Sequence, residues 1–326
     1  MPTQMRRIGE TGMLTFPLAL GVGGLGVGMT EADAFELLDT YAEAGGTTVD
    51  TARVYSDWVP GELHRSERIL GDWLRARRNR ASILLCTKGG HPDLATMGVP
   101  RLDPASLRSD VEGSLASLRV DTIDLYWLHR DDPGRGVGEI VESLVSFVRE
   151  GKIRHYGFSN WKAARIREAV LYCEAHEVPA PVGDQSLLNI GCRHMGPLAD
   201  PTMVVNSREL ESADSEMGLV PFAYSSQANG FFVKLSKASA EGRPAPVPSP
   251  YDTPANRALF STIDRHARSL SLSITQVVLG FLLTRSQTTI PLVGPRTVAQ
   301  LRDTLTAADV VLPAGVFEDL RRQAGF

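Results

Sequence analysis

Four polar side chains in the first half of the chain have the types and spacing needed for acid-assisted reduction. Asp50, Lys88 and His129 each stand at the end of an apolar, strand-like run, and Tyr55 follows Asp50 by five residues. A tyrosine with its ordinary pKa of ~10 holds its proton near neutrality, but a neighbouring Lys88 ammonium would stabilise the phenolate. Asp50 would keep Lys88 charged and oriented, and His129 would donate a hydrogen bond to a carbonyl oxygen. The set therefore predicts a site in which a hydride adds to a carbonyl carbon and Tyr55 supplies the proton.

Each of these side chains also has an ordinary structural interpretation. A lone Asp or Lys at a strand end is more often a cap or a solvated charge than a catalytic group. Tyr55 alone would be a rim aromatic, and His129 alone would be a histidine bonded to a backbone carbonyl. Four suitable side chains at the ends of consecutive strands are much less expected by chance, so the prediction depends on the whole set.

Strand-like runs that alternate with helical periodicity are expected to position these residues. The runs lie at residues 18–22, 47–50, 83–88, 123–129, 155–159, 181–185, 218–224 and 289–293. Most intervals carry apolar residues at helical spacing, as between Pro104 and Arg119, where an Asp-Pro pair marks the start. Eight βα units in unbroken rhythm predict one closed parallel barrel, the (β/α)8 or TIM fold of the α/β class, rather than an open doubly wound sheet. Neighbouring strand ends meet at one mouth of such a barrel, which would bring the four side chains together.

The remaining segments fit a single domain that covers residues 1–326. Glycines bound short apolar pieces between residues 6 and 20, which predicts a β-hairpin ahead of the first barrel strand. Residues 225–253 interrupt the alternation after the seventh strand and end in a proline-rich stretch. Connections of that length are uncommon unless they act as lids or linkers. Because regular structure resumes afterwards, we expect a long lid loop over the barrel mouth rather than a domain boundary.

Composition and charge argue against several other classes of protein. A net charge of -4, from 34 basic and 38 acidic residues, provides no general attraction for nucleic acid or an anionic membrane. No apolar h-region follows the first seven residues, no run approaches ~18 apolar residues, and the three cysteines lack CxxC spacing. We therefore expect a cytoplasmic protein without disulfides. The seven histidines form neither an HxH nor an HExxH motif. We therefore expect no metal site, which argues against a metal-dependent barrel hydrolase.

Five short stretches are spread over nearly the whole chain. They are Val49-Asp-Thr-Ala-Arg-Val-Tyr55, Leu85-Cys-Thr-Lys88, Asp124-Leu-Tyr-Trp-Leu-His129, Gly157-Phe-Ser-Asn160 and Ile290-Pro-Leu-Val-Gly-Pro-Arg296. In order and spacing, these stretches resemble the motifs of the aldo-keto reductase family. The resemblance implies a TIM barrel, NADPH as the hydride donor for a small-molecule carbonyl substrate, and catalytic roles for Asp50, Tyr55, Lys88 and His129.

The same resemblance assigns cofactor contacts position by position. The nicotinamide would be held by Ser159, Asn160, Gln185 and, through ring stacking, Tyr224. The first loop and the segment along the pyrophosphate would contribute Gly24, Leu25, Ser225, Ser226, Gln227, Asn229 and Lys234. The adenosine end would meet Gly294, Arg296, Gln300 and Asp303. A helix start near Thr297 suits a phosphate and a guanidinium binds phosphate oxygens in pairs, so Arg296 facing a 2′-phosphate favours NADP over NAD.

The chain departs from the family pattern at two places. Ser225-Ser226-Gln227 replaces the common Ser-Pro-Leu, and Thr304 stands where Asn often follows the Asp303 position. Neither change touches the four catalytic positions. From the residues alone, Tyr224 is equally well explained as a barrel-core aromatic, and the polar residues Ser159, Asn160 and Gln185 as caps on strand ends.

The residues expected around a substrate are mostly aromatic. Trp58, His91 and Trp161 would line the pocket, whereas Trp127 is expected in the barrel core. Tryptophans with polar neighbours at the rim would stack on and hydrogen-bond a keto-sugar or another polyol carbonyl. Relatives of this barrel also resemble channel β-subunits, so the alternative function is a non-enzymatic, NADPH-binding accessory or redox-sensing subunit.

Overall fold

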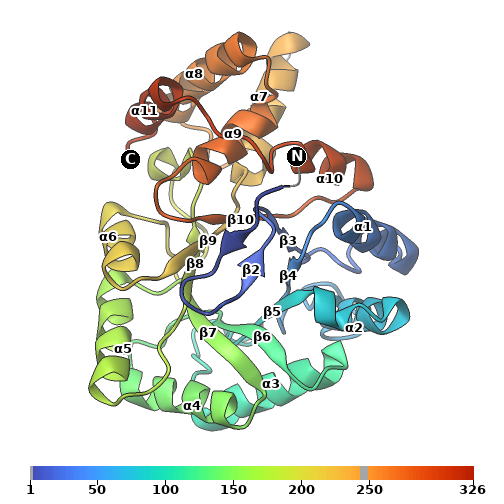
Figure 1. The fold of residues 1–326 in the computed structure, drawn as a ribbon, viewed down its shortest axis with the longest axis vertical. Helices are drawn as coiled ribbons and strands as arrows, with labels where there is room; N and C mark the ends of the chain where they lie inside the picture. The colour runs from blue at the N-terminus through green and yellow to red at the C-terminus, as the bar shows by residue number, and fades with distance from the viewer. Residues whose placement is uncertain (1–2, 243–248) are drawn as a thin grey trace.

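The computed structural model describes residues 3–242 and 249–326, and a closed barrel of parallel strands forms its centre (Figure 1). The strands are β3 (Ala19–Gly21), β4 (Thr48–Asp50), β5 (Leu84–Gly89), β6 (Ile123–Leu128), β7 (Ile153–Ser159), β8 (Gly183–Leu187), β9 (Val220–Tyr224) and β10 (Ile290–Val293). Each strand lies beside its predecessor, and β10 closes the barrel by pairing with β3. The predicted (β/α)8 barrel is confirmed, as is the N-terminal hairpin of β1 (Arg6–Arg7) and β2 (Leu14–Thr15).

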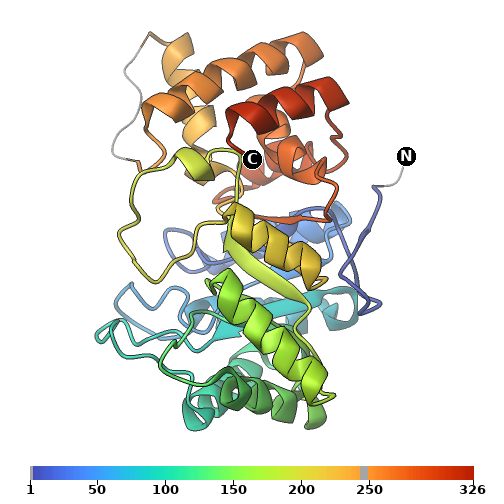
Figure 2. The same cartoon turned by 90° about the vertical axis from the view of Figure 1, so that its left-hand side faces the viewer.

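Helices surround the barrel. They are α1 (Glu31–Glu43), α2 (Arg65–Arg77), α3 (Pro104–Leu118), α4 (Val137–Arg149), α5 (Ala163–Ala175), α6 (Arg208–Glu216), α7 (Phe231–Ala240), α8 (Pro254–Leu270), α9 (Ile274–Leu283), α10 (Val298–Leu305) and α11 (Ala314–Gln323). Of these, α7, α8, α9 and α11 gather at one end of the molecule, at the top of Figures 1 and 2.

Local sequence explains where the helices begin. The Thr30 side chain accepts a bond from the Asp33 N–H while the Asp33 carboxylate accepts from the Thr30 N–H, which forms a capping box at the start of α1. The Asp103 side chain caps α3, whose first residue is Pro104. These caps orient the amphipathic helices so that their apolar faces cover the strands.

Alternation along the strands fills the barrel interior with apolar side chains. Cys86, Leu125, Trp127 and Phe222 belong to one buried cluster inside the barrel, and the Trp127 and Phe222 ring centres are 4.9 Å apart. Lys88 lies two residues beyond Cys86 on β5, so it points to the same face at the end of the strand. The core position predicted for Trp127 is therefore confirmed.

Strand register sets the height of the polar residues above this core. Asp50 on β4 is paired with Cys86, and Lys88 on β5 is paired with Trp127. His129 follows Trp127 by two residues, at the end of β6. The barrel therefore delivers these side chains to the same mouth.

Residues 225–253 differ from the lid loop that the sequence predicted. A 3-10 turn (Ala228–Gly230) leads directly into α7, whose apolar residues pack into the same buried cluster as residues of α8 and α9. Phe231, Phe232 and Leu235 have the spacing of one helix face, which explains why a helix replaces the expected loop. Residues 243–248, in the proline-rich part of the predicted lid, lie outside the described residues.

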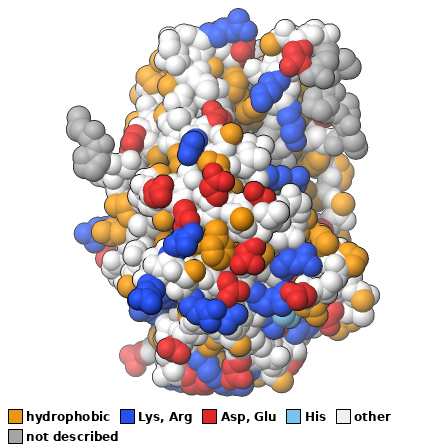
Figure 3. All heavy atoms as spheres, turned by 90° about the vertical axis from the view of Figure 1, so that its right-hand side faces the viewer, with side chains coloured by type: hydrophobic (Ala, Val, Ile, Leu, Met, Phe, Trp, Pro, Cys, Tyr) orange, Lys and Arg blue, Asp and Glu red, His pale blue; other side chains and the backbone are white. Residues whose placement is uncertain are grey.

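The surface carries charged side chains of both signs. Acidic and basic side chains are interspersed on the face drawn in Figure 3. Within residues 3–242 and 249–326, no single helix has the length and apolarity to cross a membrane. Helices α8 and α9 have that length and apolarity only when taken together, and the two are bent by 99° relative to each other.

Candidate active site

The ends of β4, β5 and β6 bring Asp50, Lys88 and His129 together, and the loop after β4 adds Tyr55. The Lys88 ammonium forms an ion pair with the Asp50 carboxylate and donates a bond of 2.8 Å to the carbonyl oxygen of Thr51. Lys88 Nζ lies 4.7 Å from the centre of the Tyr55 ring, and the His129 ring centre lies 5.6 Å from that of Tyr55. The four side chains singled out in the sequence therefore share one mouth.

Lys88 and Asp50 are almost fully buried, with 1% and 3% of their surfaces exposed. Burial on its own disfavours the ammonium, but the Asp50 carboxylate and the Tyr55 side chain outweigh it and raise the pKa of Lys88 above its ordinary value. Gln185 on β8 donates from Nε2 to the other Asp50 oxygen over 3.1 Å. Lys88 is therefore a fixed, charged donor beside Tyr55 at neutral pH.

His129 is neutral in this environment. Burial lowers the pKa of His129 well below its ordinary value, and the charge of Arg130, with His91 and Lys88, lowers it further. Its Nδ1 is buried without a hydrogen-bond partner among the described residues. A neutral imidazole carries one N–H, so His129 is suited to donate a hydrogen bond rather than to carry a charge.

The first loop of the barrel positions the Tyr55 ring. A Cβ atom placed on Gly23 would lie 3.3 Å from that ring, so Gly23 permits a close backbone approach. Ser56 has a left-handed φ of 74°, and its hydroxyl donates to the Leu25 carbonyl over 2.7 Å. At Gly24 the same construction meets no atom within 4 Å, so its neighbourhood is open. Gly24 and Leu25, both predicted to touch the cofactor, thus border the mouth beside Tyr55.

The residues assigned to the nicotinamide are bonded to one another at the ends of β7, β8 and β9. Ser159 donates to the Gln185 carbonyl over 2.7 Å. Asn160 Oδ1 accepts from the Tyr224 hydroxyl at 2.7 Å and from the Val204 N–H at 3.0 Å. These bonds match the capping interpretation, and the cofactor contacts of the same residues stay a prediction.

The segment after β9 turns sharply. Ser225, Ala228 and Asn229 have left-handed φ angles of 51°, 51° and 53°. Ser226 is buried and its hydroxyl donates to a β10 carbonyl over 2.7 Å, so that hydroxyl is occupied within the barrel wall. Lys234 Nζ donates to the Asn229 carbonyl over 3.0 Å. Ser225, Gln227, Asn229 and Lys234 lie at or near this turn, and their contacts with a pyrophosphate stay a prediction.

The start of α10 leaves one guanidinium without a partner. Arg296 is exposed, and its side chain has no hydrogen bond or ion pair within residues 3–242 and 249–326, while its backbone N–H donates to Gln300 Oε1 over 2.8 Å. Thr297 caps the helix by accepting from the Gln300 N–H. Asp303 accepts a bond of 2.9 Å from Thr275 of α9. Arg296 is thus available for an anion near Gly294, whereas Asp303 is held against the neighbouring helix.

Two of the three predicted substrate residues border the mouth. Trp58 is 52% exposed, and its ring centre lies 6.2 Å from that of Tyr55. His91 is largely buried, with its ring centre 4.7 Å from that of His129.

Trp161 does not border the mouth. It is fully buried, its ring stacks on Phe158 at 4.0 Å, and its Nε1 donates to the Arg130 carbonyl over 3.2 Å. Its predicted place in a substrate pocket is therefore corrected: residue 161 is a packing residue behind the strand ends, because stacking on Phe158 turns it inward.

Sequence reasoning missed two features near the mouth. Arg130, one of the polar residues expected at the rim beside the tryptophans, is instead buried; it donates to the His129 carbonyl over 2.8 Å and pairs with Asp200 at 2.9 Å. A cavity of about 450 Å³ also lies between the loops after β4 and β5. Leucines in those otherwise polar loops, Leu63 and Leu94, were the available signal. A larger hollow of about 710 Å³, between residues 192–208 and Gly325, contains none of the four catalytic candidates.

Comparisons with known proteins agree with this geometry. A sequence model described as the aldo/keto reductase family matches residues 17–323. The chain is 29% identical to YrpG of Bacillus subtilis, described as an uncharacterized oxidoreductase, over 94% of this chain and 91% of that protein. It is 29% identical to the norsolorinic acid reductase stcV of Emericella nidulans, over 92% and 76% of the two chains. It is 25% identical to a putative aryl-alcohol dehydrogenase, AAD14, of Saccharomyces cerevisiae, over 95% and 85%.

Proposed function

Since the chain belongs to the aldo/keto reductase family, we propose that it reduces an aldehyde or ketone to the alcohol, with NADPH as hydride donor and Tyr55 as proton donor. Family membership makes the protein an oxidoreductase that acts on carbonyl compounds. The observation that best supports the finer proposal is the position of the Tyr55 ring, 4.7 Å from Lys88 Nζ and 5.6 Å from the His129 ring.

Each side chain then has a defined part in the proton transfer. NADPH, when bound, would supply the hydride. The carbonyl carbon accepts it, the C=O electron pair moves to oxygen, and that oxygen takes the hydroxyl proton of Tyr55. The Lys88 ammonium, held by Asp50, stabilises the charge left on the phenol oxygen, and His129 donates its N–H toward the carbonyl oxygen. Water returns a proton to Tyr55, so atoms and charges balance.

The preference for NADPH is proposed from Arg296. Its exposed, unpartnered guanidinium beside the start of α10 fits a phosphate, because a guanidinium binds phosphate oxygens in pairs and a helix start favours anions. Arg296→Ala should weaken NADPH binding by about 1.5 to 3 kcal/mol and barely change NADH binding. Arg302→Ala, on the same helix, is the matched control. Equal losses for both cofactors in a titration would contradict the assignment.

The burial of two tryptophans changes the proposed class of substrate. Among Trp58, Trp127 and Trp161, just Trp58 is exposed, so the keto-sugar proposal loses part of its stacking surface. The name of one relative, a putative aryl-alcohol dehydrogenase, supports an aromatic carbonyl compound instead. We therefore propose aromatic aldehydes and ketones first and keto-sugars second.

One experiment tests the activity. Purified protein is mixed with NADPH and, in separate reactions, benzaldehyde, an aryl ketone and a keto-sugar, and NADPH consumption is followed by absorbance. Turnover of at least one carbonyl compound is expected. Tight NADPH binding without turnover of any of them would overturn the proposal and favour the accessory or redox-sensing subunit.

The cellular location stays a proposal as well. Cys86, Cys173 and Cys192 are free and buried. Unpaired cysteines of this kind suit a reducing compartment, which supports a cytoplasmic location.

A further inference from the structure

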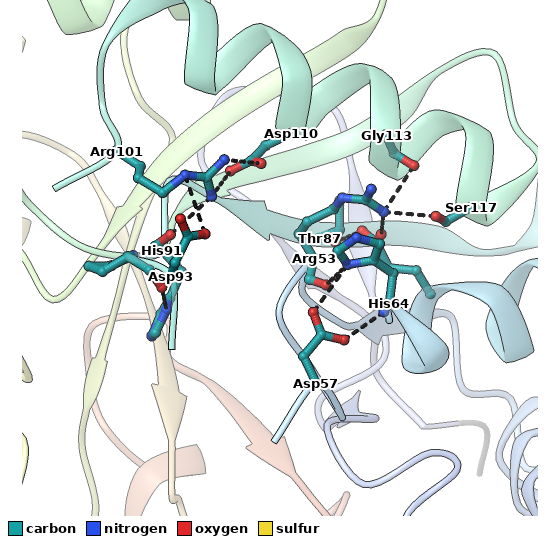
Figure 4. Close-up of polar contacts among 12 residues, drawn as sticks. Arg53, Asp57, His64, Thr87, His91, Asp93, Arg101, Asp110, Gly113 and Ser117 are labelled. Atoms are coloured by element: carbon teal, nitrogen blue, oxygen red, sulfur yellow. Dashed lines mark hydrogen bonds and ion pairs between the residues drawn. The ribbon is translucent and has the colours of Figure 1, made fainter. Parts of the chain in front are cut away.

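The cavity of about 450 Å³ beside the mouth has a mixed polar and apolar lining. Figure 4 shows the polar contacts that the charged residues of this lining make. It lies between the loop after β4 and the loop after β5, and its lining comprises Arg53, Val54, Asp57, Leu63, His64, His91, Pro92, Asp93, Leu94, Ala95, Arg101, Ser109 and Asp110. None of the four catalytic candidates is part of this lining. The cavity is therefore a separate space that borders the catalytic site.

His91 connects this cavity to the catalytic site. It is one of the residues that line the cavity, and its ring centre lies 4.7 Å from that of His129. His91 Nδ1 is 2.7 Å from the Pro92 carbonyl oxygen, so Nδ1 carries the proton and Nε2 is left as an acceptor. His91 therefore stands between the catalytic site and the cavity, and a substrate whose carbonyl lies beside His129 would have to pass this residue to enter the cavity.

The first cavity arginine is already paired inside the protein. Arg53 Nη1 lies 3.2 Å from the buried Glu67 carboxylate and donates to Ser117 Oγ at 2.8 Å and to the Gly113 carbonyl at 3.2 Å. An anionic ligand would have to compete with Glu67 for this guanidinium.

The second arginine is paired in the same way. Arg101 donates to the Asp110 carboxylate at 3.0 and 3.3 Å and to the His91 carbonyl at 3.2 Å, and its Nε lies 3.7 Å from Asp93. Figure 4 shows this group on one side of the cavity and the Arg53 group on the other. Neither guanidinium is left unpaired for a ligand carboxylate or phosphate.

Carboxylates exceed cations around the cavity. Asp57, Asp93 and Asp110 face it, against the two arginines. Asp57 is bonded to the His64 N–H at 2.6 Å and lies 3.2 Å from His64 Nδ1, whereas the Asp93 side chain is 69% exposed. The lining therefore offers acceptor oxygens, above all on Asp93, to a ligand that brings hydrogen-bond donors.

The apolar part of the lining is open to solvent. Leu63 is 58% exposed and Leu94 is 43% exposed, on opposite loops of the same cavity. Covering exposed leucines with apolar ligand surface is favourable, whereas burying an unpaired anion there is costly.

We propose that this cavity binds the part of the substrate distal to the reacting carbonyl, and that it selects an apolar distal group bearing hydroxyl or other hydrogen-bond donors over an anionic one. His91 is then the specificity-determining residue between the catalytic site and the distal subsite. The inference rests on the proposed carbonyl reduction. Benzaldehyde, a short substrate that does not need the cavity, is therefore included as the control substrate.

The first test fills the cavity. Leu94→Trp adds an indole to the lining, and Leu171→Trp, at a leucine that is 55% exposed on α5, is the matched control. With biphenyl-3- and biphenyl-4-carbaldehyde carrying a distal hydroxymethyl group, Leu94→Trp should lower kcat/KM by about tenfold for at least one isomer. Benzaldehyde turnover should change less than about twofold, and Leu171→Trp should leave all substrates unchanged. Equal losses for benzaldehyde and both biphenyls, or no loss for either biphenyl, would overturn the subsite.

The second test reverses the charge at the cavity. Wild-type protein should prefer the hydroxymethyl biphenyls over their carboxylate analogues, and Asp93→Lys should shift that ratio toward the carboxylate by about tenfold. Asp121→Lys, at an exposed position before β6, is the matched control and should leave the ratio unchanged. Because the ratio is compared between variants, the intrinsic reactivities of the aldehydes cancel. An unchanged ratio in Asp93→Lys would overturn the selection by charge.

The two proposals fail differently. No turnover of benzaldehyde or any biphenyl would contradict carbonyl reduction itself. Normal turnover of benzaldehyde, with biphenyl rates indifferent to Leu94→Trp and Asp93→Lys, would contradict the distal subsite alone.

Discussion

Two sets of buried carboxyl groups in this barrel differ in their surroundings, because an ion pair with a cation forms at only one of them. At the mouth, the Asp50 carboxylate pairs with the Lys88 ammonium and accepts a bond from Gln185. Between β8 and α6, Asp184 and Asp214 are fully buried, and neither carboxyl group forms an ion pair among the described residues. Burial raises the pKa of Asp184 to about 7, and burial together with the charge of Asp184 raises the pKa of Asp214 to about 9.

The difference between these groups lies in the partner rather than in the residue type. Asp50 has a cation within contact and keeps Lys88 charged beside Tyr55. Around Asp214, the positive charge of Arg285 is opposed by Glu211, so Asp214 keeps its proton at neutral pH while Asp184 is about half protonated. A buried ion pair seldom adds net stability over apolar packing. Under the proposed function, the Asp50–Lys88 pair would serve the reaction, whereas the Asp184–Asp214 pair makes stability depend on pH.

The largest effect is expected when the ion pair at the mouth is broken. Lys88→Met leaves the Asp50 carboxylate buried without a cation, which should cost roughly 3 to 5 kcal/mol in the free energy of unfolding. It also removes the charge that stabilises the Tyr55 phenolate, so kcat should fall ~10² to 10⁴-fold. Denaturant titration and steady-state kinetics measure the two losses.

A double variant separates the two losses. Asp50→Leu combined with Lys88→Met removes both charges, so stability should return toward that of the wild type while activity stays lost. Recovery of activity in the double variant would contradict a catalytic role for the pair.

The second effect concerns the carboxyls behind β8. The folded protein binds their protons more tightly than the unfolded chain, in which the pKa of Asp is ~3.9, so the free energy of unfolding falls as pH rises from about 4 to about 9. Asp214→Asn removes one titrating group and should stabilise the protein by roughly 1 to 3 kcal/mol at about pH 9, with a smaller gain at about pH 5. Thermal melts at both pH values test this, with the exposed Asp121→Asn as control. An equal gain at both pH values would show that deprotonation of Asp214 is not the cause of the pH dependence.

The smallest effect comes from His129 at the mouth, and it changes the free energy of unfolding with pH in the opposite direction. The pKa of buried His129 lies well below that of an unfolded histidine, ~6.5, so the unfolded chain binds more protons as pH falls below about 6.5. His129 therefore reduces the free energy of unfolding on the acid side. His129→Gln should flatten that slope by roughly 1 kcal/mol between about pH 7 and pH 5, whereas the exposed His176→Gln should not. Parallel slopes for wild type and His129→Gln would argue that His129 is charged when folded.

The barrel was predictable because the strands and most helices are encoded by local sequence patterns, namely apolar runs, helical spacing and capping residues. All eight strand-like runs overlap the observed barrel strands, and the caps at Thr30 and Asp103 mark two helix starts. The α2 helix was not predicted because it follows His64, a residue in left-handed conformation without a capping side chain. Similarly, α7 lay within a segment whose proline-rich end suggested a loop, although its own apolar spacing is helical.

The site was predictable as far as strand ends determine it. Asp50, Lys88 and His129 follow from register, but the inward packing of Trp161 depends on Phe158, its stacking partner on β7. The proximity of Asp184 to Asp214 depends on how α6 docks on β8, which no local pattern encodes. The cavity beside His91 likewise arises from two loops that meet only in the folded barrel.

The most direct test of the central claim is the activity of Tyr55→Phe with NADPH and a carbonyl substrate that the wild type reduces. This change removes one hydroxyl group and leaves the aromatic ring beside Lys88 and His129. We expect kcat to fall ~10²-fold or more while the NADPH dissociation constant and the melting temperature stay close to the wild-type values. Undiminished turnover by Tyr55→Phe would contradict the assignment of Tyr55 as the proton donor.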